Sequence, residues 1–117
     1  MVEVTRYDEA TSYEAPGHHG CYGLRLQGFE VSPTRTFWMA VSHFLPEGGC
    51  DDSATAVEKV YFVLEGEVTV VTREGEATLR KYDSCYLAPD ESRAIENRTN
   101  SPSSLLVAIP YPEPRDL

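Results

Sequence analysis

Apolar and polar residues alternate in short runs along most of the chain, and no stretch of ten or more residues repeats apolar positions at helical spacing. The runs are rich in Val, Thr, Tyr and Phe, which favour strands. The pattern predicts strands at 21–27, 36–45, 59–64, 67–72, 76–80, 84–88, 93–97 and 104–109. A series of strands with no helix between them indicates an all-β antiparallel sandwich or barrel.

Turn residues separate these runs. Each break contains Gly, Pro, Asn or Asp, which set or tolerate turn dihedrals; the breaks fall at 46–49, 65–66, 73–76, 89–90 and 100–102. The polar residues 1–20 predict an arm that packs on the barrel or on a neighbouring molecule. Because Pro cannot donate to a sheet, residues 111–117 predict a Pro-rich tail. The chain is therefore expected to form one domain, with the barrel at 21–110.

Charge and cysteine usage exclude several function classes. The 117 residues include 10 Lys plus Arg and 19 Asp plus Glu, giving a net charge of −9, which repels nucleic acid and anionic membranes. No apolar run approaches the roughly 20 residues of a membrane span, and the first residues are too acidic and polar for a secretion signal. Cys21, Cys50 and Cys85 form an odd set without a CxxC pair, as expected for free thiols in the cytoplasm.

Two stretches carry a family resemblance. Residues 48–71 read GGCDDSATAVEKVYFVLEGEVTVV, and residues 82–97 read YDSCYLAPDESRAIEN. Together they resemble the two sequence motifs of the cupin superfamily. The resemblance implies a jelly-roll barrel, or double-stranded β-helix, whose interior site holds a divalent metal through three His and one Glu. The VYFVLEGEV strand without His-x-His is also similar to the metal-free halves of the ureidoglycine aminohydrolases.

The family's metal ligands are replaced in this chain. The resemblance places the Glu ligand at Lys59 and the distal His at Arg93. The His-x-His pair falls on Asp52 and Ala54, or on Ser53 and Thr55. Lys and Arg offer no lone pair to a metal at neutral pH. We therefore expect neither a bound metal nor another cofactor.

The replacing cations suggest a different ligand. Alternation in KVYFVL, oriented by the resemblance, directs Lys59 and Tyr61 into the barrel, and Arg93 enters from the facing strand. Two interior cations favour an anion, and the planar Arg fork suits a carboxylate. The expected partner is a small carboxylated metabolite. Alternatively, both cations form structural ion pairs at the barrel mouth with Glu58, Glu91 or Asp52.

Lys59 and His43 are the candidates for proton transfer. A desolvated Lys beside an Arg should have a lowered pKa, which suits a general base or a Schiff base with a carbonyl substrate. His43 falls on the apolar face of Met39, Val41 and Leu45 and is expected to point inward, as a core residue or as an acid–base group. Trp38 and Phe44 fall on the opposite face and are expected in an inter-sheet or dimer core.

The remaining candidates are less specific. His18 and His19 follow a Pro-Gly turn and can either reach the barrel mouth or lie in a surface loop. At the mouth, one of them can form a displaced metal site with His43 and a carboxylate. Cys85 faces either the cavity or the core, and Cys50 is expected to lie in a loop without a role.

Three functions follow from these candidates. The leading one is a metal-independent isomerase, lyase or hydrolase with catalytic His43, Lys59 and Tyr61 and a ligand site formed by Arg93, Lys59 and His43. The second is a non-catalytic ligand-binding or accessory cupin, and the third is a metal-dependent cupin with displaced ligands. A cavity shared by His43 and Lys59 would favour the first over the second. The strand TFWMAVSHFL has large residues on both faces, which predicts a homodimer.

Overall fold

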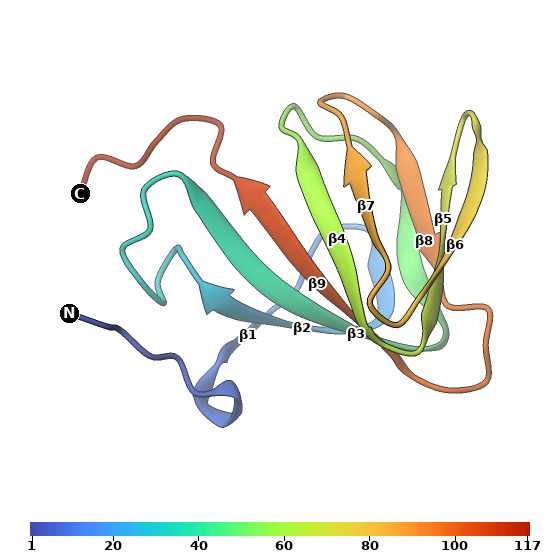
Figure 1. Cartoon of the computed structure of the whole chain (residues 1–117), viewed down its shortest axis with the longest axis horizontal. Helices are drawn as coiled ribbons and strands as arrows, with labels where there is room; N and C mark the ends of the chain where they lie inside the picture. Colours follow the sequence, from blue (N-terminus) through green and yellow to red (C-terminus); the bar gives the residue numbers. More distant parts are fainter.

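The computed structural model describes residues 1–117 and is built almost entirely from strands (Figure 1). A single 3-10 turn, η1 (Tyr7–Glu9), is the only helical element, and no helix in the structure has the length and apolar character needed to cross a membrane. The strands are β1 (Thr11–Tyr13), β2 (His18–Gln27), β3 (Phe37–Ser53), β4 (Lys59–Glu65), β5 (Glu67–Thr72), β6 (Gly75–Arg80), β7 (Ser84–Leu87), β8 (Arg93–Glu96) and β9 (Ser103–Pro110).

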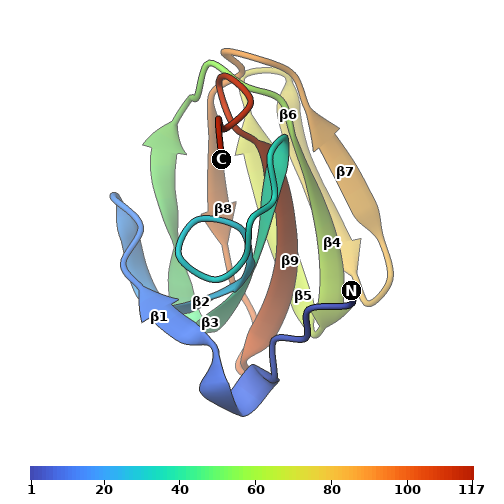
Figure 2. The same ribbon diagram turned by 90° about the vertical axis from the view of Figure 1, so that its left-hand side faces the viewer.

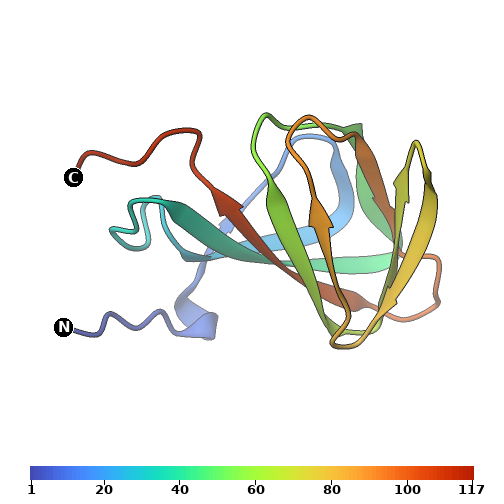
Figure 3. The same cartoon turned by 45° about the horizontal axis from the view of Figure 1, so that its top comes forward.

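The strands curl into a nearly closed antiparallel barrel. Their order is β6-β5-β8-β3-β9-β4-β7, with β2 added to β3 and β1 added to β2. Figure 2 shows β9, β4 and β7 side by side, and Figure 3 shows β5, β6 and β8 curving round the other side of the barrel. This architecture confirms the predicted all-β jelly roll. Strands β4 to β9 also match their predicted bounds within one residue at each end.

Strand β3 joins the two sides of the barrel. Its first half pairs with β9, from Phe37 opposite Pro110 to Phe44 opposite Ser103, and its second half pairs with β8. The strand therefore continues through residues 46–49, where the sequence predicted a break. That prediction is wrong because the Pro-Glu-Gly-Gly segment bends the strand without ending it, with Glu47 at φ 69°. Gly49 fits this bend since a Cβ there would collide with the Ile95 carbonyl oxygen.

Asn97 holds the bend in place. Its side-chain amide donates to the carbonyl oxygens of Phe44 at 3.1 Å and Leu45 at 3.2 Å. Its backbone N–H donates to the Gly48 carbonyl at 2.9 Å. Asn97 is 1% exposed, so these bonds satisfy groups that water does not reach. The family-motif Asn is thus a structural residue.

The N-terminal segment packs on its own barrel. Strand β1 pairs with β2, with Tyr13 opposite Gly23. Strand β2 begins at His18, inside the segment predicted as an arm. Of the two alternatives for residues 1–20, the structure shows packing on the same chain. The segment thereby covers part of the barrel mouth.

The core lies between the two sides of the barrel. Every member comes from strands β3 to β9, and their burial supplies the main driving force for folding. The cluster comprises Phe44, Cys50, Tyr61, Val63, Val68, Val70, Leu79, Leu87, Ile95, Leu105 and Val107.

Candidate functional site

A cavity of about 360 Å³ opens inside the barrel. Much of its wall is apolar and comes from β3, β8 and β9, with Trp38, Phe44, Ile95, Leu105, Val107 and Ile109. Lys59, Tyr61 and Arg93 contribute polar groups, and no Asp or Glu lines the cavity. Pockets of this size, apolar with a few convergent polar groups, are typical of sites for small molecules.

Alternation along β4 sets two of these polar groups. Lys59, Tyr61 and Val63 are 2%, 2% and 0% exposed, whereas Val60 is 44% exposed on the outer face. The predicted inward face of β4 is therefore confirmed. Because Lys59 is the first residue of the strand, its side chain enters the cavity where the 53–59 connection leaves the barrel.

Arg93 enters from β8, as predicted. It is 6% exposed, and its Nε donates to the Tyr61 hydroxyl at 2.7 Å. Its Nη1 donates to the Ser53 hydroxyl at 2.6 Å, and Nη2 has no hydrogen bond within the chain. The Tyr61 oxygen accepts from Arg93, so the Tyr61 proton stays free to be donated elsewhere. Arg93 Nη2 and the Tyr61 hydroxyl are thus two donors without an acceptor at this end of the cavity.

Lys59 makes one hydrogen bond, from Nζ to the Thr55 hydroxyl at 3.1 Å. None of the ion pairs of the molecule includes Lys59 or Arg93. The predicted alternative of ion pairs with Glu58, Glu91 or Asp52 is therefore wrong; Glu91, for example, accepts from the Ala88 N–H instead. Two buried cations without a carboxylate are costly for the fold. An anionic ligand would offset that cost.

The charges of the site are tuned by burial and proximity. Burial, and then the charge of Arg93, lower the pKa of Lys59 to about 8. Burial alone would lower the pKa of Arg93, but its contacts with Tyr61 raise it above the ordinary value. Burial raises the pKa of Tyr61, although Arg93 opposes that shift. Near neutral pH the site therefore offers a permanent cation, a neutral hydroxyl and a readily deprotonated amine.

His43 does not enter this cavity, and the prediction that it points inward is wrong. It is half-buried on the outer face of β3, opposite Tyr22 of β2. Its Nε2 lies 2.7 Å from the Tyr7 hydroxyl and its Nδ1 lies 2.7 Å from the Ser104 hydroxyl. Burial lowers its pKa. The structure thus brings Lys59, Tyr61 and Arg93 together and leaves His43 on the other side of the sheet.

The opposite face of β3 lines the cavity. Trp38, Ser42 and Phe44 line the cavity. Phe44 also belongs to the core between the two sides of the barrel, as expected, whereas Trp38 is half-buried and lies outside that core cluster. On the outer face, Tyr7 of the N-terminal segment packs edge-on against His43. Val41 on that outer face is only 2% exposed, and its burial mimics an inward position.

His18 and Cys50 form a pair that the sequence did not reveal. Strand β2 places His18 opposite Cys50 of β3, and His18 lines the cavity while stacking on Phe44 with 6.4 Å between ring centroids. Cys50 is 2% exposed, so its predicted place in a loop is wrong. Burial would raise the Cys50 pKa, but His18 and Arg93 lower it overall. Interaction with the Cys50 thiol raises the pKa of His18, whose Nδ1 lies 3.0 Å from the Pro16 carbonyl oxygen.

The displaced metal set does not assemble. His18 faces the cavity, His19 lies 3.9 Å from the Asp51 carboxylate at the surface, and His43 lies across the sheet. No cluster of three or more His, Cys, Asp or Glu in the structure has the arrangement to hold a metal ion. For Cys85, the sequence allowed either the cavity or the core. Cys85 packs against the core and does not line the cavity.

Comparisons with known proteins agree with this architecture. No protein-family model matches the chain. The chain is 40% identical over 111 residues to a protein of Mycobacterium tuberculosis described as beta-D-galactosidase Rv1717, covering 95% of this chain and 96% of that protein. An RmlC-like cupin from Shewanella frigidimarina superposes with a TM-score of 0.76 at 16% identity, covering 94% of this chain and 91% of its own. The chain has the cupin fold and belongs to the same family as the Mycobacterium tuberculosis relative.

A further cupin-like neighbour shows how general the fold is. The polyketide cyclase RemF from Streptomyces resistomycificus superposes with a TM-score of 0.84 at 15% identity, covering 100% of this chain and 86% of that one. Identities this low establish the fold alone, because one fold hosts many chemistries. The function of this cupin-fold protein therefore depends on the side chains of its own cavity.

Proposed function

We propose that this cupin binds a small carboxylated metabolite inside its barrel, without a metal. The observation that carries the proposal is the pair of buried cations, Lys59 and Arg93, that lack an acidic partner within the chain. A carboxylate accepting from the open Nη2 of Arg93 and from Lys59 Nζ would supply the missing charge. The Tyr61 hydroxyl is a third donor to the same group.

The other lining residues and the volume of the cavity indicate the size and polarity of the rest of the ligand. Trp38, Phe44, Leu105 and Val107 present apolar surface, which favours an alkyl or aryl body. A volume of about 360 Å³ lies at the low end for ligand pockets, so the expected molecule is small. The metabolite is therefore amphipathic, with its acidic end held at Arg93.

The catalytic version of the proposal uses Lys59 and Tyr61. An amine with a pKa of about 8 takes up protons effectively near neutral pH, and a neutral tyrosine can return one. These two groups suit proton transfer beside a bound carboxylate, as in an isomerase, lyase or hydrolase. His43 lies outside the cavity and has no part in this version. A non-catalytic ligand-binding cupin would use the same contacts without turnover.

Ligand-dependent thermal unfolding tests the proposal. A panel of small carboxylates and sulfate should raise the melting temperature, with a stabilisation of about 2.7 kcal/mol at a hundredfold excess over the dissociation constant. Arg93→Met should abolish that shift, because Met keeps much of the length but neither charge nor fork. Arg98→Met, at an exposed arginine, is the matched control and should retain it. A flat panel for the unmodified protein would refute the proposal, and elemental analysis after dialysis should find no stoichiometric metal.

A second candidate function comes from the relative described as a beta-D-galactosidase, which is 40% identical over 95% of this chain. Most glycosidases need two carboxyl groups at the scissile bond, and the barrel cavity contains none. Acidic groups do gather at a separate hollow beside β3 and β8, lined by Glu47, Asp51, Asp52 and Glu96. Hydrolysis of a chromogenic β-galactoside that is lost in amide variants of these residues, but kept in Arg93→Met, would favour this candidate.

We also propose that the protein is a homodimer. The outer face of the sheet β2-β3-β9-β4-β7 exposes Tyr22, Val60 and Tyr86, at 57%, 44% and 58%. Val60 and Tyr86 are register neighbours, so their side chains form a continuous apolar surface. A second copy packed on this face would bury it. A monomer mass by light scattering at about ten micromolar protein would contradict the dimer.

A further inference from the structure

Lys59 and Arg93 donate to two hydroxyl groups close together in the chain, at the end of β3 and just after it. The Arg93 fork donates to Ser53 and the Lys59 amine donates to Thr55, two residues further along the chain. The amine and the guanidinium line the same cavity, and the charge of Arg93 lowers the pKa of Lys59. A ligand that meets both groups needs two functional groups, one for each.

The two cationic groups have different chemistry. Arg93 remains charged and offers the free Nη2, which suits a carboxylate. Lys59 Nζ is buried, has a single hydroxyl partner and has no carboxylate to keep it protonated. A desolvated amine of this kind is a nucleophile toward carbonyl carbon. The Tyr61 hydroxyl, whose proton is unused, can donate to the carbonyl oxygen.

We propose that Lys59 forms an imine with the carbonyl carbon of a 2-oxo acid whose carboxylate is bound by Arg93. This inference rests on the proposed carboxylate site and names the class of molecule that it takes. A 2-oxo acid carries a carbonyl for Lys59 and a carboxylate for Arg93, which line the same cavity. The apolar wall around Phe44 and Leu105 favours an aryl or branched alkyl tail over pyruvate itself.

The step balances without a cofactor. The Lys59 lone pair adds to the carbonyl carbon, and one amine proton passes to the carbonyl oxygen to give a carbinolamine. The carbinolamine hydroxyl then leaves as water after taking one proton from solvent, and the C=N bond forms with a positive charge on nitrogen. The substrate carboxylate compensates that charge and lies on Arg93. No oxidant or reductant is consumed.

The composition of the chain makes the test specific, because Lys59 and Lys81 are its only lysines. Protein is incubated with phenylpyruvate and cyanoborohydride at pH 8, and the reduced adduct is located by intact mass and peptide mapping. At this pH an amine of pKa about 8 is half unprotonated, roughly a hundredfold more than a lysine of ordinary pKa. Of the two lysines, only Lys59 is expected to form an adduct, and the Met1 amine serves as an internal reference. The Lys59 adduct should persist in Lys81→Arg, the matched control, and disappear in Lys59→Arg.

Competition keeps the test decisive if Lys59→Arg fails to fold. Phenylacetate has the carboxylate and the ring but no ketone, so an excess should suppress labelling of Lys59 and leave the Met1 amine unaffected. Labelling spread equally over Lys81 and Met1 would overturn the imine. If carboxylates stabilise the protein but no Lys59 adduct forms, the imine fails and the binding site stands. If carboxylates neither stabilise nor compete, both proposals fail.

Discussion

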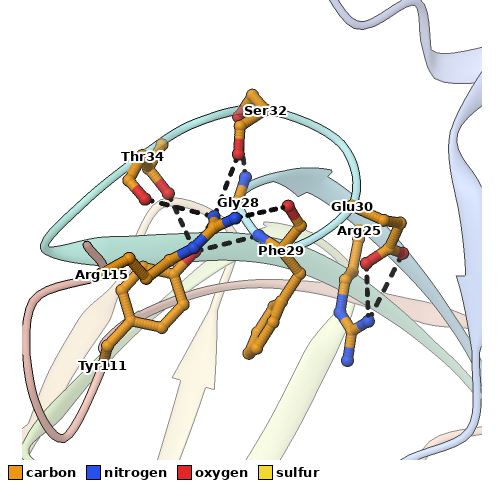
Figure 4. Close-up of polar contacts among 8 residues, drawn as sticks. All are labelled: Arg25, Gly28, Phe29, Glu30, Ser32, Thr34, Tyr111 and Arg115. Atoms are coloured by element: carbon orange, nitrogen blue, oxygen red, sulfur yellow. Dashed lines mark hydrogen bonds and ion pairs between the residues drawn. The ribbon is translucent and has the colours of Figure 1, made fainter. Parts of the chain in front are cut away.

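Two arginines of this cupin-fold protein occupy opposite environments, one in the C-terminal tail and one in the barrel. In the tail, Arg115 Nη1 donates to the carbonyls of Ser32 at 3.1 Å and Thr34 at 3.2 Å and to the Tyr111 hydroxyl at 3.0 Å. Its Nη2 donates to the Phe29 carbonyl at 3.1 Å (Figure 4). The fork thereby holds the 28–34 loop against the tail, with most of its capacity used.

The barrel arginine leaves part of its capacity unused. Arg93 donates to Tyr61 and Ser53, but Nη2 stays open and the neighbouring Lys59 adds a second positive charge without an acid. Arg93 is also the more deeply buried of the two. A saturated cation is what a structural role requires, because the chain itself supplies every acceptor. Open donors on a buried cation point instead to a partner from outside the chain.

Removing the tail arginine should have the largest effect on stability. Arg115→Met loses four donated hydrogen bonds, and we expect the free energy of unfolding to fall by about 2–3 kcal/mol, because bonds to a charged donor contribute more than neutral ones. Urea unfolding at pH 7 measures this loss. The carboxylate-induced shift should be unchanged, since the tail does not line the cavity.

The control for this variant is Arg98→Met. Arg98 pairs with Glu76 and Glu96 at the surface, and exposed pairs contribute little, so its loss should be much smaller. Equal losses in the two variants would mean that the tail bonds have no special structural role. A diminished carboxylate response in Arg115→Met would show that the two arginines are coupled.

Removing the Lys59 amine should raise the free energy of unfolding at neutral pH, whereas removing Arg115 lowers it. The pKa of Lys59 is about 8 in the folded protein against roughly 10.4 when unfolded, so below pH 8 the fold bears the cost of a buried charge. Lys59→Met should therefore be more stable than the parent at pH 7, by on the order of 2 kcal/mol. Between pH 8 and about 10.4 the folded parent loses that proton first and its relative stability rises, so the difference should close.

Paired urea titrations of Lys59→Met and the parent at pH 7 and pH 10 measure this change. Taking the difference between the two proteins cancels the titration of other groups. Lys81→Met is the matched control, because Lys81 is half-exposed and lies 3.5 Å from Glu65. A Lys59→Met variant that is less stable than the parent at both pH values would show that Lys59 is a structural residue after all.

The sequence predicted those features that depend on the alternation of apolar and polar residues along a strand. Strict alternation in KVYFVL, bounded by Gly66, determines the face of β4 and so the burial of Lys59 and Tyr61. The family spacing then placed Arg93 opposite them. These predictions hold because a strand buried on one side leaves little freedom of register.

Long-range packing determined what the sequence missed. The prediction for His43 is wrong because both faces of β3 carry buried residues: Val41 is 2% exposed on the outer face, where Tyr7 contacts His43, and Phe44 is 1% exposed on the inner face. The bend at 46–49 depends on Asn97, about fifty residues away. Cys50 lies in the core only because β3 continues past that bend. Such contacts leave no signal in a local pattern of apolar and polar residues.

Removing the Tyr61 hydroxyl should have the smallest of the predicted effects on stability. Tyr61→Phe leaves Arg93 Nε without its 2.7 Å acceptor, and we expect a loss of about 1 kcal/mol in the ligand-free protein. A bound carboxylate can accept from that Nε, so saturating ligand should recover most of the lost stability, and the carboxylate-induced shift in melting temperature should persist or grow.

Tyr111→Phe is the matched control, because its hydroxyl accepts from Arg115 and from the Phe29 N–H at 2.9 Å. Its loss should be independent of ligand, since no small anion takes its place among the loop and tail contacts. If ligand left the Tyr61→Phe loss intact, the Tyr61–Arg93 bond would be structural in the same sense as the tail cluster, and the contrast between the two arginines would narrow to the open Nη2 alone.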